Sequence, residues 1–159
     1  MKILGIGHDL WISSACLIEN GNLLSAVPEE RINRQKGYQG FPIKAINSLL
    51  ATNNLSIEDL DLFCVGWNPS QYFNALHPRF SKTPRWRAEM LYAIPNYIQS
   101  MYEEPLDPSF TELGIEGIKA KIKFYDHHKC HSYCSYGLSG FKKSINISID
   151  GRGERKTSS

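Results

Sequence analysis

Asn20-Gly21 is the sequence feature that most constrains the fold, because it lies between two short apolar runs. Asn-Gly readily adopts the positive φ angles of a two-residue hairpin, so the pair predicts a tight turn between antiparallel strands at residues 14–19 and 23–28. Residues 2–7 are another apolar run, bounded by glycine, and predict a buried strand ahead of the hairpin. The chain is therefore expected to open with three strands in an antiparallel meander.

Helical and extended patterns alternate after the meander. A helix is expected from Phe41-Pro42, with proline at its first position and apolar residues at helical spacing, and Asn53-Asn54 ends it. The remaining expected elements are a capped turn at residues 56–59, strands at residues 62–67, 121–125 and 144–149, and a helix at residues 127–136. This order is typical of a ribonuclease H-like lobe of the actin-like ATPase superfamily. We expect an α/β fold in which a five-stranded mixed sheet carries helices on both faces and its fourth and fifth strands run parallel to the first.

Composition and charge exclude several classes of protein. The chain has 159 residues, the size of one domain, and its net charge of +2 comes without the clustered basic face of a nucleic-acid binder. It has neither a secretory signal nor an apolar run of about 20 residues that would span a membrane. We therefore expect a cytoplasmic protein with no nucleic-acid or membrane partner, whose four cysteines are thiols.

Three of the five histidines lie within the five residues 127–131. His127 and His131 are four residues apart, so on a helix their rings share one face and can bind one metal ion. His128 lies about 100° further round the helix and is not expected to join them, although it is three residues from His131 and could substitute for His127 if the helix begins late. Asp126 precedes the helix and can cap it. Histidines at this spacing also occur on ordinary solvated helices, and the spacing alone leaves both interpretations open.

Two glycine-containing turns are candidates for binding a phosphate. Asp150-Gly151-Arg152-Gly153 directly follows the last expected strand, and its amides could cradle a phosphate while the Asp150 carboxylate faces the ligand or its metal. The first turn offers Gly7, Asp9, Ser13 and Ser14. Each of these turns could equally be a plain loop. Ligands of open α/β sheets gather beyond the carboxyl ends of the strands, so both turns should converge with residues 126–131 at one end of the sheet.

Five motifs in this order resemble the carbamoyltransferase family that includes the nodulation protein and the enzymes that carbamoylate aminoglycosides and cephems. By itself, the segment that begins with Glu29-Glu30-Arg31 would be a charged loop. The motifs are the opening strand with its turn up to Leu17, Pro28-Glu29-Glu30-Arg31-Ile32-Asn33-Arg34-Gln35-Lys36, Phe41-Pro42, His127-His128-Lys129-Cys130-His131, and Asp150-Gly151-Arg152-Gly153-Glu154. The resemblance covers nearly the whole chain and is vague over residues 70–118.

The resemblance implies carbamoyl transfer to a hydroxyl or amine of a small-molecule acceptor. Carbamoyl phosphate and ATP would form a carbamoyl-adenylate in a C-terminal domain, and the ribonuclease H-like domain would pass the carbamoyl group on. Its metal, iron, manganese or zinc, would be held by His127, His131 and an aspartate of a second lobe. Asp9 would face the acceptor, and Gly7, Ser13, Ser14, Asp150, Gly151 and Gly153 would contact the adenylate. Residues 1–159 would be the N-terminal lobe only, which is not expected to complete the reaction without the C-terminal portion of the enzyme.

Two other interpretations remain. In a small zinc module, His127, Cys130 or His131, and Cys134 would supply ligands from one helix face, although one straight helix rarely supplies a whole tetrahedral site. A non-catalytic ribonuclease H-like module would bind a nucleotide without transferring a group.

Overall fold

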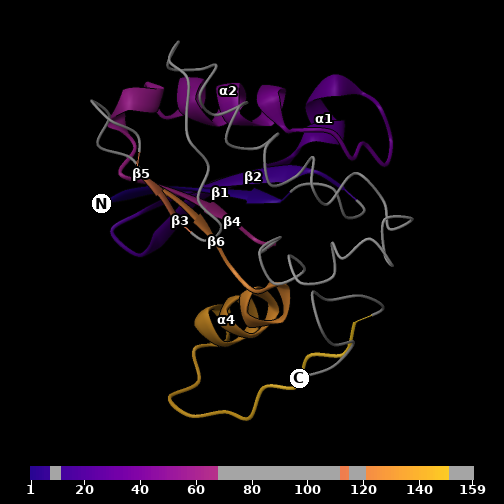
Figure 1. The fold of residues 1–159 in the computed structure, drawn as a ribbon, viewed down its shortest axis with the longest axis vertical. Coiled ribbons are helices and arrows are strands. Elements are labelled where there is room, and N and C mark those ends of the chain that lie inside the picture. Colours follow the sequence, from indigo (N-terminus) through magenta and orange to yellow (C-terminus); the bar gives the residue numbers. More distant parts are fainter. Residues whose placement is uncertain (8–11, 68–111, 115–120, 151–159) are drawn as a thin grey trace, which may run out of the picture.

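The computed structural model describes residues 1–7, 12–67, 112–114 and 121–150, which form one mixed sheet with helices on either side (Figure 1). The strands are β1 (Lys2–Gly7), β2 (Ser14–Glu19), β3 (Asn22–Pro28), β4 (Leu62–Val65), β5 (Glu112–Gly114) and β6 (Lys121–Phe124). The helices are α1 (Glu29–Asn33), α2 (Ile43–Thr52) and α4 (His127–Ser139), with a 3-10 turn η1 at Ile57–Asp59. Among the described residues, no helix is long and apolar enough to cross a lipid bilayer.

The predicted meander is confirmed. Strands β1 and β2 pair antiparallel, as do β2 and β3. Asn20 has a φ of 50° and Gly21 a φ of 84°, so both residues of the turn are in the left-handed region that a tight hairpin requires. The capped turn after α2 is also confirmed, because Ser56 and Asp59 form a reciprocal capping box at η1.

Five of the six expected strands form, and β4 and β6 run parallel to β1 as predicted. The sheet order is β3-β2-β1-β4-β6-β5, so a sixth strand that the sequence did not predict lies at one edge. This strand, β5, has three residues and pairs antiparallel with β6. The expected strand at residues 144–149 is wrong, because this segment is extended but only Ile149 takes part in a β-bridge. Alternating apolar residues show which side chains would share a face of a strand, but a strand forms only where a neighbouring strand pairs with its backbone.

The hydrophobic core lies between α2 and one face of the sheet. Alternate residues of β1, β2, β4 and β6 point into it, among them Leu4, Leu17, Phe63 and Ile122, each with 0% of its surface exposed. Helix α2 contributes four buried residues at helical spacing. It begins at Ile43, with Pro42 as its N-cap rather than its first residue. Helices α1 and α2 lie on this side of the sheet and α4 on the other (Figure 1).

The charged segment after β3 was expected to be a loop, but it forms the short helix α1. Its first residue, Glu29, is only 3% exposed. The Glu29 carboxylate accepts a hydrogen bond of 2.6 Å from the backbone N–H of Ala45, in the first turn of α2. The Glu30 carboxylate accepts another, of 2.8 Å, from the N–H of Gly37. An anion at a helix N-terminus satisfies an N–H that the helix leaves unpaired, so Glu29 joins α1 to α2, while Glu30 holds the connection between them.

Candidate metal centre

Helix α4 begins directly beyond the carboxyl end of β6. The Asp126 side chain caps it, as predicted, by accepting a hydrogen bond of 2.9 Å from the N–H of Lys129. The helix extends further than expected, to Ser139, and ends at Gly140 in the left-handed conformation. This cap fixes where the first turn starts, and the first turn carries the histidines.

His127 and His131 converge with Asp150, which lies in the extended segment after α4. The Nε2 atoms of His127 and His131 are 3.0 Å apart. Asp150 Oδ2 lies 2.8 Å from the first and 3.1 Å from the second. Three potential ligand atoms therefore surround one point, and among the described residues no other group of three histidines, cysteines or acids is as close.

The choice of His127 over His128 agrees with this geometry. The His128 ring is 6.1 Å from that of His127 and its side chain is buried, with no hydrogen-bond partner for its Nε2. The rings of His127 and His131 are 4.4 Å apart, edge to face. The carboxylate of the site differs from the one expected. The resemblance implied a carboxylate from a second lobe, whereas here Asp150 of the same chain lies against both rings.

The carboxyl ends of β1, β4 and β6 lie at one edge of the sheet because these strands are parallel. His127 follows β6 there, and Gly7 ends β1 opposite Ser14 at the start of β2. Ser13 is fully buried, and its backbone bonds to Tyr38 and Glu29. The expected convergence with residues 126–131 is thus observed for Asp150, whereas Asp9, Gly151 and Gly153 lie outside the described residues.

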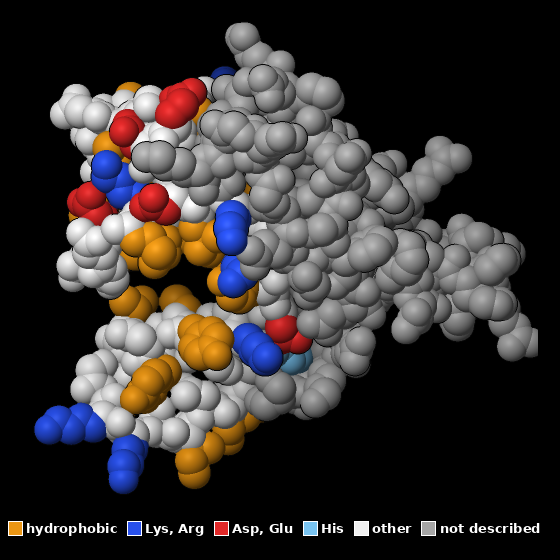
Figure 2. All heavy atoms as spheres, turned by 60° about the vertical axis from the view of Figure 1, so that its left-hand side comes forward, with side chains coloured by type: hydrophobic (Ala, Val, Ile, Leu, Met, Phe, Trp, Pro, Cys, Tyr) orange, Lys and Arg blue, Asp and Glu red, His pale blue; other side chains and the backbone are white. Residues whose placement is uncertain are grey.

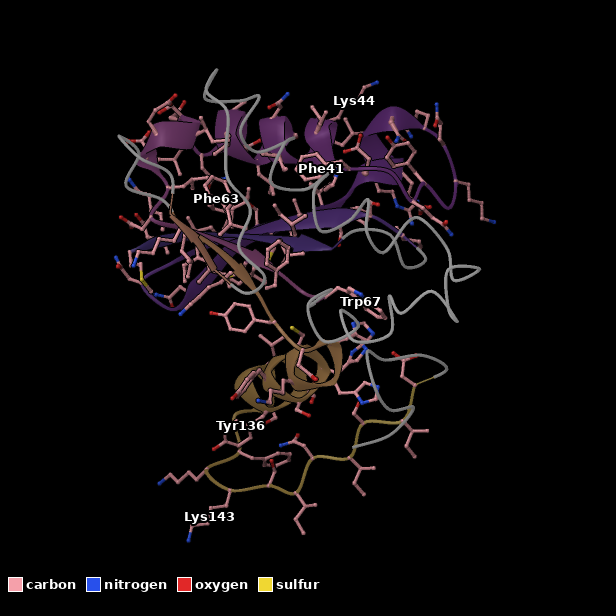
Figure 3. The ribbon with its side chains drawn as sticks, in the orientation of Figure 1. Phe41, Lys44, Phe63, Trp67, Tyr136 and Lys143 are labelled. Atoms are coloured by element: carbon pink, nitrogen blue, oxygen red, sulfur yellow. The ribbon has the colours of Figure 1, made fainter. Side chains whose placement is uncertain are left out.

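Two contacts of His127 were not predicted from the sequence. Its Nδ1 lies 3.3 Å from the carbonyl oxygen of Gly66, and its ring centroid is 5.3 Å from that of Trp67. Both residues fall at the end of the expected strand 62–67, where side chains and carbonyls reach the carboxyl edge of the sheet. Trp67 is 1% exposed and lies beside the first turn of α4 (Figure 3).

The cysteines do not support the zinc-module interpretation. In the described part of the chain, no group of three potential ligands includes a thiol. Cys16 and Cys64 belong to the sheet, while Cys130 and Cys134 belong to α4. Burial raises the pKa of the Cys64 thiol to about 11, so the protonated form of this sheet residue is favoured.

Comparison with known proteins identifies the family to which the chain belongs. The family model described as "Carbamoyltransferase N-terminus" matches residues 2–159. The nodulation protein NolNO of Sinorhizobium fredii is 28% identical over 92% of this chain, and an uncharacterized protein of Synechocystis, sll1178, is 29% identical over 99% of it. The chain spans 20% of the first relative and 26% of the second. Among solved structures, YeaZ from Pseudomonas aeruginosa aligns with a TM-score of 0.29 and 16% identity, over 41% of this chain and 29% of that one. Because the family model covers nearly every residue, the chain belongs to the carbamoyltransferase N-terminal family.

Proposed function

We propose that this chain is the metal-binding lobe of a carbamoyltransferase and that His127, His131 and Asp150 hold its divalent ion. The observation that carries the proposal is the convergence of two imidazole nitrogens and one carboxylate oxygen within 3.1 Å of one another. The family supplies carbamoyl transfer as the general activity. The sheet, a meander followed by parallel strands, supports a ribonuclease H-like lobe.

The three ligand atoms fit a metal ion by both chemistry and spacing. Two ligands about 2.1 Å from one ion lie ~3.0 Å apart at right angles and ~3.4 Å apart at a tetrahedral angle. The separations of 2.8, 3.0 and 3.1 Å match the right angle. Two imidazoles and a carboxylate on one face leave further positions open, an arrangement that suits iron(II). We therefore place iron first, with manganese and zinc as the alternatives.

A bound ion at this site would polarise the carbamoyl or phosphate oxygen as a Lewis acid. The chain's own residues supply the rest of the proposed site. His127, with 13% of its side chain exposed, would orient the ligand set, and His131, with 52% exposed, would leave one side of it open. Gly7 lies close against Ser14, since a Cβ at Gly7 would meet the Ser14 hydroxyl at 3.0 Å, and the backbone of this small-residue edge is proposed to approach the phosphate.

The proposed substrates follow from the resemblance. Carbamoyl phosphate and ATP would give carbamoyl-adenylate in the C-terminal portion of the complete enzyme, and this lobe would bind it through the edge with Gly7 and Ser14 and the turn with Gly151 and Gly153. The acceptor would be a hydroxyl or amine of a natural product or sugar, with Asp9 beside it. Ser13 is a weaker candidate for contacting the adenylate, because its side chain is fully buried.

Elemental analysis of the purified chain tests the proposal. After loading with iron(II) and dialysis, the wild type should retain about one equivalent, whereas His127→Ala, His131→Ala and Asp150→Ala should each lose most of it. His128→Ala is the matched control, because its ring points away from the other two, and circular dichroism should confirm that each variant is folded. Equal metal content in all variants would contradict the site. The complete enzyme should then transfer radiolabel from carbamoyl phosphate to an acceptor only when loaded.

A further inference from the structure

The residues that follow β4 hold His127 from outside the ligand set. Gly66 offers its carbonyl oxygen to Nδ1 of His127 at 3.3 Å, while its own N–H donates to the carbonyl oxygen of Ile6 at 3.2 Å. The next residue, Trp67, packs its ring against the imidazole at 5.3 Å and an angle of 53°. Both residues are therefore anchored to the central strands, and His127 is anchored through them.

The hydrogen bond to Gly66 decides which ring nitrogen of His127 is available. A carbonyl oxygen can only accept, so Nδ1 must carry the proton that points at it. In the neutral imidazole this leaves Nε2 with a lone pair, and Nε2 is the atom that faces His131 and Asp150. The Gly66 carbonyl thus selects the tautomer that a metal requires.

Among the described residues, His131 has no such support. Its side chain contacts His127 and Asp150, the other two members of the set, and half of it is exposed. Figure 3 shows Trp67 near the start of α4, at the opposite end of β4 from the part of the core that holds Phe63. The two ligands on α4 are therefore held unequally, one by the sheet and one by the site itself.

We infer that Gly66 and Trp67 are positioning residues that fix the tautomer and the orientation of His127, and through them the affinity of the site for its metal. This inference rests on the proposed metal site. Groups that orient a metal ligand from behind typically change metal affinity by about 10- to 100-fold when they are removed. A packed indole and a carbonyl of the sheet backbone would supply this support without contacting the ion.

Zinc binding to the purified chain tests the indole, with a chromophoric chelator as competitor. Trp67→Leu should weaken zinc binding by about tenfold or more, and Trp67→Phe, which keeps an aromatic ring, should weaken it less. Phe63→Leu is the control for general destabilisation, because Phe63 is a fully buried aromatic residue of β4 in the hydrophobic core. It should lower the unfolding midpoint without changing zinc affinity.

Nitrogen-15 NMR of the zinc-loaded wild type tests the carbonyl. His127 should be bound through Nε2 and protonated at Nδ1, and the Nδ1 proton should exchange with water more slowly than that of His131. Coordination of His127 through Nδ1, or a Trp67→Leu variant that is folded and binds zinc as tightly as Phe63→Leu, would overturn the inference. If the wild type binds no zinc or iron at all, it is the proposed metal site that fails.

Discussion

The sheet with α2 and the segment from α4 onward are built in different ways. The sheet region buries a continuous apolar core in which Leu4, Phe63 and Val65 are fully enclosed. From residue 127 to residue 150, His128 and Ser148 are the buried residues. Large apolar side chains are instead exposed there, namely Tyr133, Tyr136, Leu138, Phe141, Ile145, Ile147 and Ile149. Figure 2 shows hydrophobic side chains at the surface of the lower part of the molecule, across a hollow from the upper part.

This difference shows where the site gets its rigidity. Core packing stabilises the sheet, and the sheet positions His127 through the residues at its carboxyl edge. The extended segment that carries Asp150 contributes little burial, so polar contacts to the two histidines hold its end in place. A bound cation would strengthen this arrangement, because the two imidazole nitrogens and the Asp150 carboxylate oxygen would then all bind the same ion.

Two phenylalanines test the comparison with the largest expected effect. Phe63→Ala should cost about 3–5 kcal/mol of unfolding free energy, since it leaves a cavity in the core. Phe141→Ala should change it by less than about 0.5 kcal/mol, because 67% of Phe141 is exposed. Urea denaturation followed by circular dichroism measures both. Similar losses would mean that the segment after α4 is packed as tightly as the sheet.

Two cysteines extend the comparison to chemical reactivity. The pKa of Cys64 is raised to about 11 by burial, so at pH 8 its thiolate fraction is about 100-fold below that of a thiol with the ordinary pKa of 9.0. Cys134, on α4, is exposed. Iodoacetamide should therefore modify Cys134 first and Cys64 much later, as followed by mass spectrometry of peptides. Equal rates would show that the sheet opens as readily as the helix.

Substitution of two glycines by alanine should change the free energy of unfolding in opposite directions. A Cβ at Gly5 would lie 2.6 Å from the Cys16 sulfur on the neighbouring strand, so Gly5→Ala should cost about 1–3 kcal/mol. A Cβ at Gly137, within α4, would meet nothing within 4 Å, and Gly137→Ala should gain about 0.5–1 kcal/mol from helix propensity. Cys16→Ala should restore part of the Gly5→Ala loss. A loss at Gly137 would contradict the open packing around α4.

The smallest expected effect concerns acid stability at η1. The Ser56 backbone N–H, which donates to the Asp59 carboxylate, lowers the pKa of Asp59 below 3.8. Its stabilising contribution is present above the unfolded pKa and is lost as the pH falls through the lower, folded value. Asp59→Asn should therefore reduce the drop in thermal midpoint between pH 7 and pH 3. An unchanged drop would mean that the cap does not contribute to acid sensitivity.

Local signals in the sequence predicted most of the sheet and both longer helices. Asn20-Gly21 fixed the hairpin, and Asp126 with Gly140 bounded α4, because turns and caps depend on adjacent residues. The three-residue β5 and the charged α1 were missed, since both are too short to show a period and depend on contacts with distant residues. Residues 144–149 show the reverse error, a strand pattern without a strand partner.

The candidate site also contains features that local sequence predicts and features that depend on distant residues. The spacing of His127 and His131 follows from helical geometry and was predicted. The convergence of Asp150 with them was expected from the position of both segments beyond the carboxyl ends of strands, but their direct contact, 19 residues beyond His131, depends on how the chain returns after α4. The support from Gly66 and Trp67 comes from a neighbouring strand and was likewise invisible without the sheet order.

X-ray absorption of the iron- or zinc-loaded chain tests the central claim most directly. The account predicts two imidazole ligands and carboxylate oxygen at about 2.0–2.2 Å, with no sulfur scatterer. In His131→Ala one imidazole should disappear, and in Asp150→Ala the carboxylate oxygen should be replaced by water or the metal lost. A sulfur shell at about 2.3 Å, or a spectrum that none of the three substitutions changes, would contradict a metal centre built from His127, His131 and Asp150.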